Sequence, residues 1–146
     1  MKPWLWLPPQ LAHDLGPYAL RTLARFKNEP TPVWRPFEFR SLHFQNRWGI
    51  AGGVDKNGDQ VLPWWALGAG FVEIGTITPQ PQTPNPGKIM DRDLQLEAVW
   101  NKMGFPSKGI ESVKKNLAKL KRPYRTPIFL NVGKNRNTAN ESASAD

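Results

Sequence analysis

Residues 48–54 read Trp-Gly-Ile-Ala-Gly-Gly-Val, and a polar loop, Asp-Lys-Asn-Gly-Asp, follows at residues 55–59. A short apolar run that ends in glycines is typical of a buried strand. Two further apolar runs, at residues 71–77 and 127–132, are separated by helical patterns at residues 60–68 and 107–120. Strands that alternate with helices predict an α/β fold with a parallel sheet.

The segments around this unit are shorter and less regular. Apolar residues at helical spacing predict a pair of helices within residues 9–26, with Gly16-Pro17 as the break between them. Residues 27–36 contain three prolines and no apolar period, so we expect a linker there. Two alternating runs predict a hairpin of residues 37–39 and 42–44. We expect a long loop rich in Pro, Gln, Thr and Asn after residue 77, and a polar tail at 133–146.

Composition restricts the class of protein. The 146 residues include 15 prolines but also 39% hydrophobic residues and seven tryptophans, which excludes a coiled coil, a collagen and a disordered tail. Zero cysteines exclude a disulfide scaffold and a cysteine nucleophile, and two histidines leave little for a metal site. No run of about 18 apolar residues is present to span a membrane, and the apolar run at residues 4–7 is too short for a signal peptide. We therefore expect a chain on the cytoplasmic side without a bound metal.

The formal net charge of +8 is concentrated toward the carboxyl terminus. Residues 101–146 carry ten basic and three acidic residues, whereas residues 1–100 carry ten and nine. Such a basic stripe is one way to bind nucleic acid. However, Ile110, Val113 and Leu117 recur at helical spacing, and no aromatic residues interleave with the lysines as in single-strand binders. We therefore expect the solvated face of one helix and no nucleic-acid partner.

Glycine and polar residues stand where each predicted strand ends. Gly52 and Gly53 let a planar ring or a phosphate approach backbone N–H groups closely, and Lys56 places a cation beside an anionic ligand. A plain glycine turn with a solvated lysine is the alternative. Thr76 and Asn131 end the next two strands, and residues 101–105 add amide and cationic groups. Because parallel strands bring their carboxyl ends to one edge, these groups would suit a flat, hydrogen-bonding, anionic ligand.

Four stretches in this order carry a family resemblance: AGGVDKNG (51–58), GFVEIGTITPQPQTPNP (70–86), NKMGF (101–105) and NVGKN (131–135). Over residues 8–138, opening with Pro-Gln-Leu-Ala-His13, the chain resembles the class 2 dihydroorotate dehydrogenases, which are quinone-dependent and membrane-associated. That family folds as a (β/α)8 TIM barrel behind a small helical extension. The resemblance therefore implies a helical membrane and quinone-site extension with its linker at residues 1–36. Residues 37–146 would form the first three strand–helix units of an FMN-binding barrel.

The resemblance also implies an activity and a set of site residues. The activity is FMN-dependent oxidation of dihydroorotate to orotate, with quinone as electron acceptor, in pyrimidine (UMP) biosynthesis. FMN contacts fall on Gly52, Gly53, Val54, Asp55, Lys56, Thr76 and Asn131. Substrate contacts fall on Lys56, Asn101, Lys102, Met103, Gly104 and Phe105. The family usually has arginine where this chain has Lys102, which keeps the charge and loses the planar fork.

The quinone site of the resembled family falls on His13 and Arg92. A surface helix residue is the alternative interpretation of His13. The family commonly has a Pro-Arg-aliphatic-Phe-Arg run that ends at this arginine, whereas Lys-Ile-Met-Asp precedes Arg92 here. Trp4, Leu5, Trp6 and Leu7 would suit an interfacial anchor. The resemblance thus implies a peripheral protein on the cytoplasmic face of the inner membrane.

A complete barrel takes about 250 residues, and the family's catalytic serine base has no counterpart in these 146 residues. Ser142 and Ser144 belong to the polar tail and are not candidates for that role. We therefore expect a truncated amino-terminal part that has no turnover alone and holds FMN weakly or not at all. The alternative is a non-catalytic half-barrel that binds a partner chain, because an open third strand exposes an unpaired edge.

Overall fold

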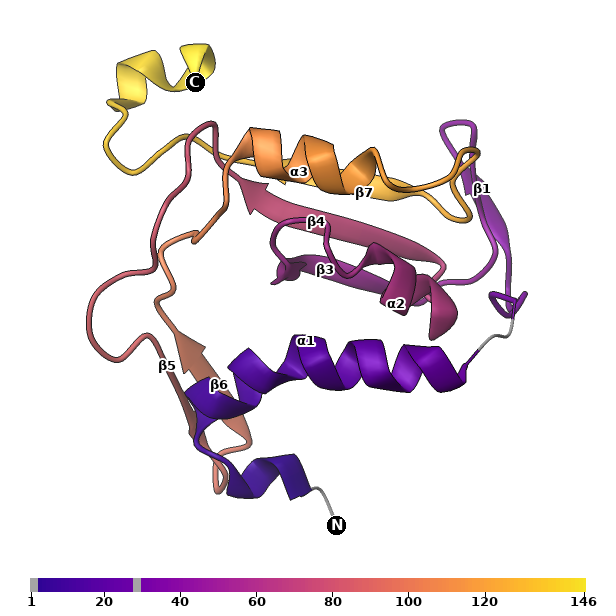
Figure 1. The fold of residues 1–146 in the computed structure, drawn as a ribbon, viewed down its shortest axis with the longest axis horizontal. Helices are drawn as coiled ribbons and strands as arrows, with labels where there is room; N and C mark the ends of the chain where they lie inside the picture. Colours follow the sequence, from indigo (N-terminus) through magenta and orange to yellow (C-terminus); the bar gives the residue numbers. More distant parts are fainter. Residues whose placement is uncertain (1–2, 28–29) are drawn as a thin grey trace.

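The computed structural model describes residues 3–27 and 30–146 and builds them around a parallel sheet (Figure 1). The elements follow in the order η1 (Pro3–Trp6), α1 (Pro9–Phe26), β1 (Phe37–Phe39), β2 (Leu42–Phe44), β3 (Gly49–Asp55), α2 (Val61–Ala66), β4 (Phe71–Ile77), β5 (Met90–Asp93), β6 (Ala98–Asn101), α3 (Ile110–Leu117), β7 (Ile128–Val132) and η2 (Asn140–Ala145). The predicted α/β class and the three principal strands are confirmed.

The three-stranded sheet has the order β3-β4-β7, so β4 is the central strand. Both pairings are parallel, and Val72 of β4 faces Ile50 of β3 on one side and Ile128 of β7 on the other. Helix α2 connects β3 to β4, and α3 lies in the connection from β4 to β7. This is the strand–helix alternation of an α/β barrel over its first strands.

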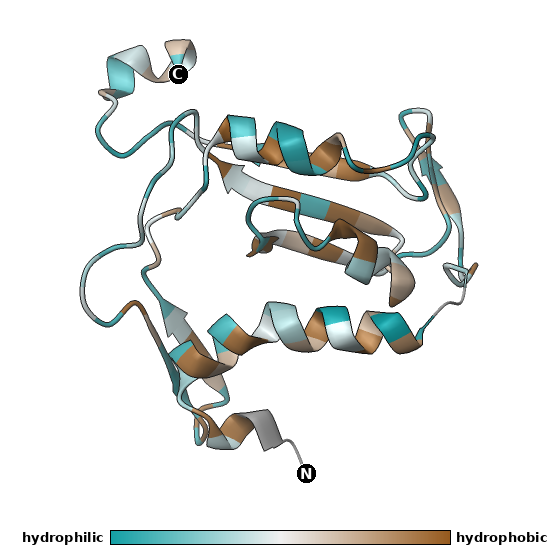
Figure 2. Ribbon diagram, in the orientation of Figure 1, coloured by the Kyte–Doolittle hydropathy of each residue, from teal (hydrophilic) through white to brown (hydrophobic). Residues whose placement is uncertain are grey.

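The hydrophobic core lies between the sheet and the helices α2 and α3. Its buried members are Ile50, Val61, Trp65, Ala69, Val72, Ile74, Ile77, Val113 and Leu120. Figure 2 shows apolar residues along β3 and β4 and a mixture of apolar and polar residues on α1 and α3. Burial of each large aliphatic side chain contributes about 1.5–3 kcal/mol. The core therefore covers one face of the sheet and holds the strands in register.

Stacked phenylalanines close the amino end of the sheet. The β1–β2 hairpin stacks Phe37 on Phe44 with ring centroids 4.5 Å apart. Phe44 in turn lies 5.9 Å from Phe71 of β4 and 6.2 Å from Phe129 of β7. Gly49 makes room for this cluster, since a Cβ there would lie 2.3 Å from the Phe71 ring. The phenylalanine cluster thus covers the amino end of the sheet, and a ligand site is expected at the polar carboxyl end.

Helix α1 is a single helix, so the predicted break at Gly16-Pro17 is wrong. A proline inside a helix removes one backbone hydrogen bond, and contacts of α1 with α2 and β5 offset that loss. Among the described residues, none of the helices combines the length and apolar character needed to cross a membrane.

The loop expected after residue 77 contains a second hairpin, formed by β5 and β6. Met90 pairs with Asn101 and Asp93 with Ala98. The signal for it in the sequence is weak, because all four residues of β6 are exposed and the turn at 94–97 contains neither glycine nor proline. The hairpin lies beside the first turns of α1 (Figure 1). Asn101 therefore ends a strand, and Lys102 begins the loop that follows.

The far edge of β7 is open within the described part of the chain. Its edge away from β4 pairs with none of the described residues, and Leu130 and Val132 are 54% and 72% exposed. The element that follows is the 3-10 helix η2, not an α-helix.

The predicted division of the chain between residues 36 and 37 stays a prediction. Residues 1, 2, 28 and 29 of the expected amino-terminal extension lie outside the described residues.

Replacement of Ile74 by alanine tests the core. Ile74 is 0% exposed at the centre of β4, so Ile74→Ala is expected to lower the free energy of unfolding by about 2–5 kcal/mol. Urea unfolding followed by circular dichroism measures this change. Val132→Ala, on the open strand β7, is the control and is expected to change the free energy by less than about 0.5 kcal/mol. Equal losses in the two variants would contradict the assigned core.

Candidate functional site

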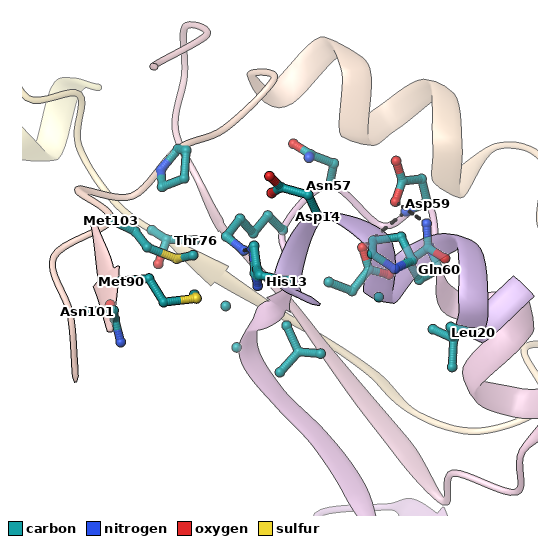
Figure 3. A pocket seen from close by; sticks show the side chains of 18 of the residues that line it. His13, Asp14, Leu20, Asn57, Asp59, Gln60, Thr76, Met90, Asn101 and Met103 are labelled. Atoms are coloured by element: carbon teal, nitrogen blue, oxygen red, sulfur yellow. Dashed lines mark hydrogen bonds between the residues drawn. The ribbon is translucent and has the colours of Figure 1, made fainter. Parts of the chain in front are cut away.

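A cavity of about 1380 Å³ opens at the carboxyl ends of β3, β4 and β7. The predicted site residues that line it are His13, Gly52, Gly53, Val54, Asp55, Lys56, Thr76, Asn101, Lys102, Met103, Gly104, Phe105 and Asn131. Figure 3 shows labelled side chains from α1, the β3–α2 loop, β4 and β6 around this space. Residues from positions 13 to 131 thus share one cavity, as the sequence pattern predicted for the strand ends.

The paired glycines at the end of β3 have different roles. Gly53 has φ +90° and nothing within 4 Å of a Cβ built on it, so its backbone is open to a ligand. At Gly52, however, a Cβ would lie 2.9 Å from Oε1 of Glu73, so this glycine makes room for a neighbouring side chain. The expected close approach of a ligand to the backbone is therefore available at Gly53, while Gly52 accommodates Glu73.

Asp55 organises the loop that carries Lys56. The backbone N–H groups of Asp59 and Gln60 donate to its Oδ1 and Oδ2 at 3.2 and 3.0 Å. The Asp55 side chain is buried, and burial raises the pKa of this carboxyl group above its usual value, against the opposing effect of the backbone donors. Asp55 thus fixes the start of α2 and, with it, the position from which the Lys56 side chain extends.

Lys56 and His13 meet inside the cavity. Lys56 Nζ lies 3.4 Å from Nε2 of His13, which extends from α1. Burial lowers the pKa of Lys56, and the nearby carboxylates of Asp55 and Asp14 oppose this shift. Burial also lowers the pKa of His13, helped by the charge of Lys56 and opposed by Asp14. A neutral imidazole that accepts a hydrogen bond from an ammonium group is the arrangement these shifts favour.

A hydrogen-bonded chain crosses the central and third strands. Thr76 Oγ1 donates to Oδ1 of Asn131 at 2.8 Å, and Asn131 Nδ2 donates to Oε1 of Glu73 at 3.0 Å. Glu73 and Thr76 are on β4, and Asn131 is on β7. We call Thr76, Asn131 and Glu73 the polar array. All three side chains line the cavity.

The segment 101–105 is held by the loop at residues 82–85. Asn85 Nδ2 donates to the Lys102 carbonyl at 2.7 Å, and the Asn85 backbone N–H donates to the Met103 carbonyl at 2.9 Å. Gly104 has φ +77°, and a Cβ there would lie 2.4 Å from Asn85 Oδ1. Lys102 Nζ lies 5.7 Å from the centre of the Trp100 ring. The loop thus holds the backbone of this segment, and the Trp100 ring lies beside the Lys102 ammonium group.

Arg92 has a different environment from the other predicted site residues. Its guanidinium group, on β5, donates to the backbone carbonyls of Leu5 and Leu7, which flank the end of η1. Arg92 is not among the residues that line the cavity. It joins the β5–β6 hairpin to the amino-terminal segment, and its assignment to a quinone site stays a prediction.

Several cavity residues were not predicted from the sequence, chiefly Asp14, Glu73 and Asn85. The sequence could have indicated Glu73, because it is the only charged residue in the apolar run 71–77. A charge in a buried strand requires a partner. Asn85 and Asp14 lie in segments without a comparable signal. Among the described residues, no group of three or more His, Asp or Glu side chains is placed to hold a metal ion.

The pKa of His13 predicts how stability depends on pH. Because the folded chain lowers this pKa below 6.5, the unfolded chain binds more protons in acid, and stability falls as the pH falls through this range. In His13→Gln, the part of the acid-induced loss of stability that comes from His13 should be absent. Urea unfolding at pH 7.5 and pH 5.5 measures the free energy of unfolding of the parent chain and of His13→Gln. The two proteins are compared at each pH because the raised pKa of Asp55 acts in the opposite direction. An identical pH dependence in the two variants would contradict the assignment.

Comparisons with known proteins identify the family of this chain. A family model described as Dihydroorotate dehydrogenase matches residues 37–145. A relative named Dihydroorotate dehydrogenase (quinone) from Aromatoleum aromaticum is 40% identical over 141 residues, covering 96% of this chain and 40% of the relative. One of the same name from Xylella fastidiosa is also 40% identical, covering 92% of this chain and 39% of the relative.

Solved structures lead to the same family. The crystal structure of DHODH from Eimeria tenella in complex with ferulenol superposes with a TM-score of 0.75 and 34% identity, over 94% of this chain and 38% of that one. This chain therefore spans about two-fifths of the length of the relatives it matches. The family match over residues 37–145 and the identity over nearly the whole chain show that it belongs to the dihydroorotate dehydrogenase family.

Proposed function

We propose that this chain forms the amino-terminal part of the site at which a quinone-dependent dihydroorotate dehydrogenase oxidises dihydroorotate to orotate, a step of de novo pyrimidine (UMP) biosynthesis. The observation that carries the proposal is the convergence of the residues of three strand ends, the 101–105 segment and His13 on one cavity. At about 1380 Å³ this cavity exceeds the 300–1,000 Å³ of most single-ligand pockets. Its size suits a cofactor and a small substrate side by side.

The donor set of the cavity fits FMN. The open backbone at Gly53 admits a flat ring, the ammonium group of Lys56 balances negative charge, and the Asn131 amide supplies a polar contact. When bound, FMN supplies two-electron redox chemistry, which no side chain of this chain provides. The role of the chain is to position the ring and to place fixed charge beside it.

The 101–105 segment suits an anionic ring substrate. Dihydroorotate and orotate carry a carboxylate and several ring amide groups, which match the ammonium group of Lys102 and the amide of Asn101. Both residues line the same cavity as Lys56, so the cavity combines cations from two separate segments. The Trp100 ring beside Lys102 Nζ limits where that cation lies. Lysine forms a point contact here, where arginine would form a bidentate one.

Helix α1 would border the quinone site and lie on a membrane surface. His13 on α1 reaches Lys56, so the helix borders the site. Exposed apolar side chains continue along η1 and α1, with Trp6 75% and Phe26 85% exposed. Tryptophan and apolar residues on one helical segment favour binding in the interfacial plane of a bilayer. We propose peripheral attachment on the cytoplasmic face of the inner membrane; the side chain of Trp4 lies outside the described residues.

The reaction also needs a base to take the substrate proton. In the resembled family this is a serine on a loop with no counterpart among these 146 residues. Ser142 and Ser144 lie on η2, and neither lines the cavity. We therefore expect the 146-residue chain alone to have no turnover.

The second candidate is a non-catalytic module that binds a partner chain. The open edge of β7 and its exposed Leu130 and Val132 favour this function, because a sheet edge and an apolar face together offer a surface for added strands. Turnover in a fusion that supplies the rest of the barrel distinguishes the candidates, since a module that only binds a partner chain contributes no cofactor or substrate contacts to the fusion.

A fluorescence titration of FMN with the purified chain tests the proposed site. We expect weak binding, and Lys56→Met is expected to weaken it about tenfold, as for the loss of one charged contact. Lys121→Met removes an exposed lysine away from the cavity and is expected to leave the affinity unchanged. Equal effects of the two substitutions on binding, or on the turnover of a complete barrel, would contradict a flavin site at Lys56.

Turnover requires the rest of a barrel, which a chimera can supply. We expect the purified chain to show no dihydroorotate-dependent quinone reduction, and a fusion to the remaining part of the Aromatoleum aromaticum relative to show it. In the fusion, Lys56→Met should reduce the rate and Lys121→Met should not. Turnover by the 146-residue chain alone would overturn the assignment of the base to a missing segment.

A further inference from the structure

We propose that Glu73 is a positioning residue that fixes the orientation of the Asn131 carboxamide and, through it, makes the Thr76 hydroxyl a hydrogen-bond acceptor toward the cavity. The site would then take a ligand N–H or O–H group at Thr76. That FMN or dihydroorotate supplies this group rests on the proposed function; the positioning itself rests on the polar array alone.

The argument begins at the Glu73 carboxylate. An ionised carboxylate is an acceptor only, whereas an asparagine carboxamide has a donor end and an acceptor end. Since Glu73 Oε1 lies 3.0 Å from Asn131, the group that faces it is Nδ2. Oδ1 then faces the opposite way and lies 2.8 Å from Thr76 Oγ1. The charge-assisted bond to Glu73 is the stronger of the two, so it decides the orientation of the amide.

The consequence appears at Thr76. A hydroxyl group has one proton, and Thr76 donates it to Asn131 Oδ1. Only its lone pairs are left for the cavity that it lines. If the amide were reversed, Nδ2 would face Thr76 and the hydroxyl proton would be free to point at a ligand. The Glu73 carboxylate, acting through Asn131 on the neighbouring strand β7, thus selects a donor group on the ligand.

Glu73 is built into this position. No ion pair among residues 3–27 and 30–146 includes it, and Gly52 leaves the space that its carboxylate occupies. A side chain at position 52 would displace Oε1 from Asn131, since its Cβ would lie 2.9 Å from that atom. The glycine of β3 and the glutamate of β4 therefore act together on the amide of β7.

The first test is nuclear magnetic resonance of the side-chain amides in the ¹⁵N-labelled chain without FMN. We expect one Asn131 Nδ2 proton to be shifted strongly downfield and to exchange slowly with water. Asn116 is an internal control, because its Nδ2 donates to a neutral carbonyl of Asn57 at a similar 3.0 Å. In Glu73→Gln the Asn131 signal should move to the range of Asn116. An Asn131 signal that is ordinary in the parent chain, or unchanged in Glu73→Gln, would overturn the proposal.

The second test exchanges the carboxylate at position 73 and the carboxamide at position 131. Glu73→Gln alone frees the amide to reverse, and Asn131→Asp alone places two carboxylates together. The double variant, Glu73→Gln with Asn131→Asp, restores one donor facing one carboxylate and keeps Thr76 as an acceptor. We expect each single variant to weaken FMN binding about tenfold, as for one lost hydrogen bond. The double variant lacks the Asn131 amide but is expected to bind FMN more tightly than either single variant.

A merely structural role predicts a different pattern. In that case losses in FMN affinity would follow losses in thermal stability, and the double variant would bind no better than the weaker single variant, which would overturn the proposal. If the parent chain alone binds no FMN, the same variants are compared in the fusion to the remaining part of the Aromatoleum aromaticum relative. No FMN binding by that fusion would contradict the proposed function, while the Asn131 amide signal still decides the role of Glu73. If Glu73→Gln does not fold, the parent signal and the double variant decide it.

Discussion

The site depends on the position of β4 between β3 and β7. Parallel pairing on both edges aligns the carboxyl ends of three strands, and the registers at Val72 and Ile74 set where those ends lie. Because the same strand supplies Ile74 to the core and Thr76 to the cavity, the packing of α2 and α3 also fixes the ligand-facing groups. A slip of one residue would turn Glu73 and Thr76 toward the helices and the aliphatic residues toward the cavity.

The two ends of the sheet have opposite chemistry. At the amino end, a cluster of phenylalanine rings joins the sheet to the β1–β2 hairpin and buries Phe44. At the carboxyl end, the ammonium of Lys56 and the polar array face a cavity that α1 borders through His13. This asymmetry is general in α/β barrels, where stability and chemistry occupy different ends. The helix that borders the site is also the one that exposes apolar side chains, which links the cavity to the proposed membrane surface.

Much of the fold and of the candidate site could be predicted from the sequence, because these features depend on local sequence pattern. The strand at 71–77, its neighbours and the glycines at Gly53 and Gly104 follow from apolar runs and turn residues. The β5–β6 hairpin did not, since β6 is exposed and the turn at 94–97 contains neither glycine nor proline. The continuity of α1 through Pro17 depends on packing against α2 and β5. The turn at Arg40 and Ser41 has φ of 47° and 64° without the usual glycine. The role of Gly52 depends on the side chain of Glu73, which lies on another strand.

The central claim is that the carboxyl ends of β3, β4 and β7 together receive a flavin. Hydrogen–deuterium exchange of the purified chain with and without FMN measures this directly, because bound ligand slows exchange of the backbone amides it covers. Slower exchange at residues 52–56, at Thr76 and at Asn131, with the basic helix α3 unchanged, is the result we predict. Protection confined to α3 and the lysines beside it would show charge attraction alone and would contradict the account.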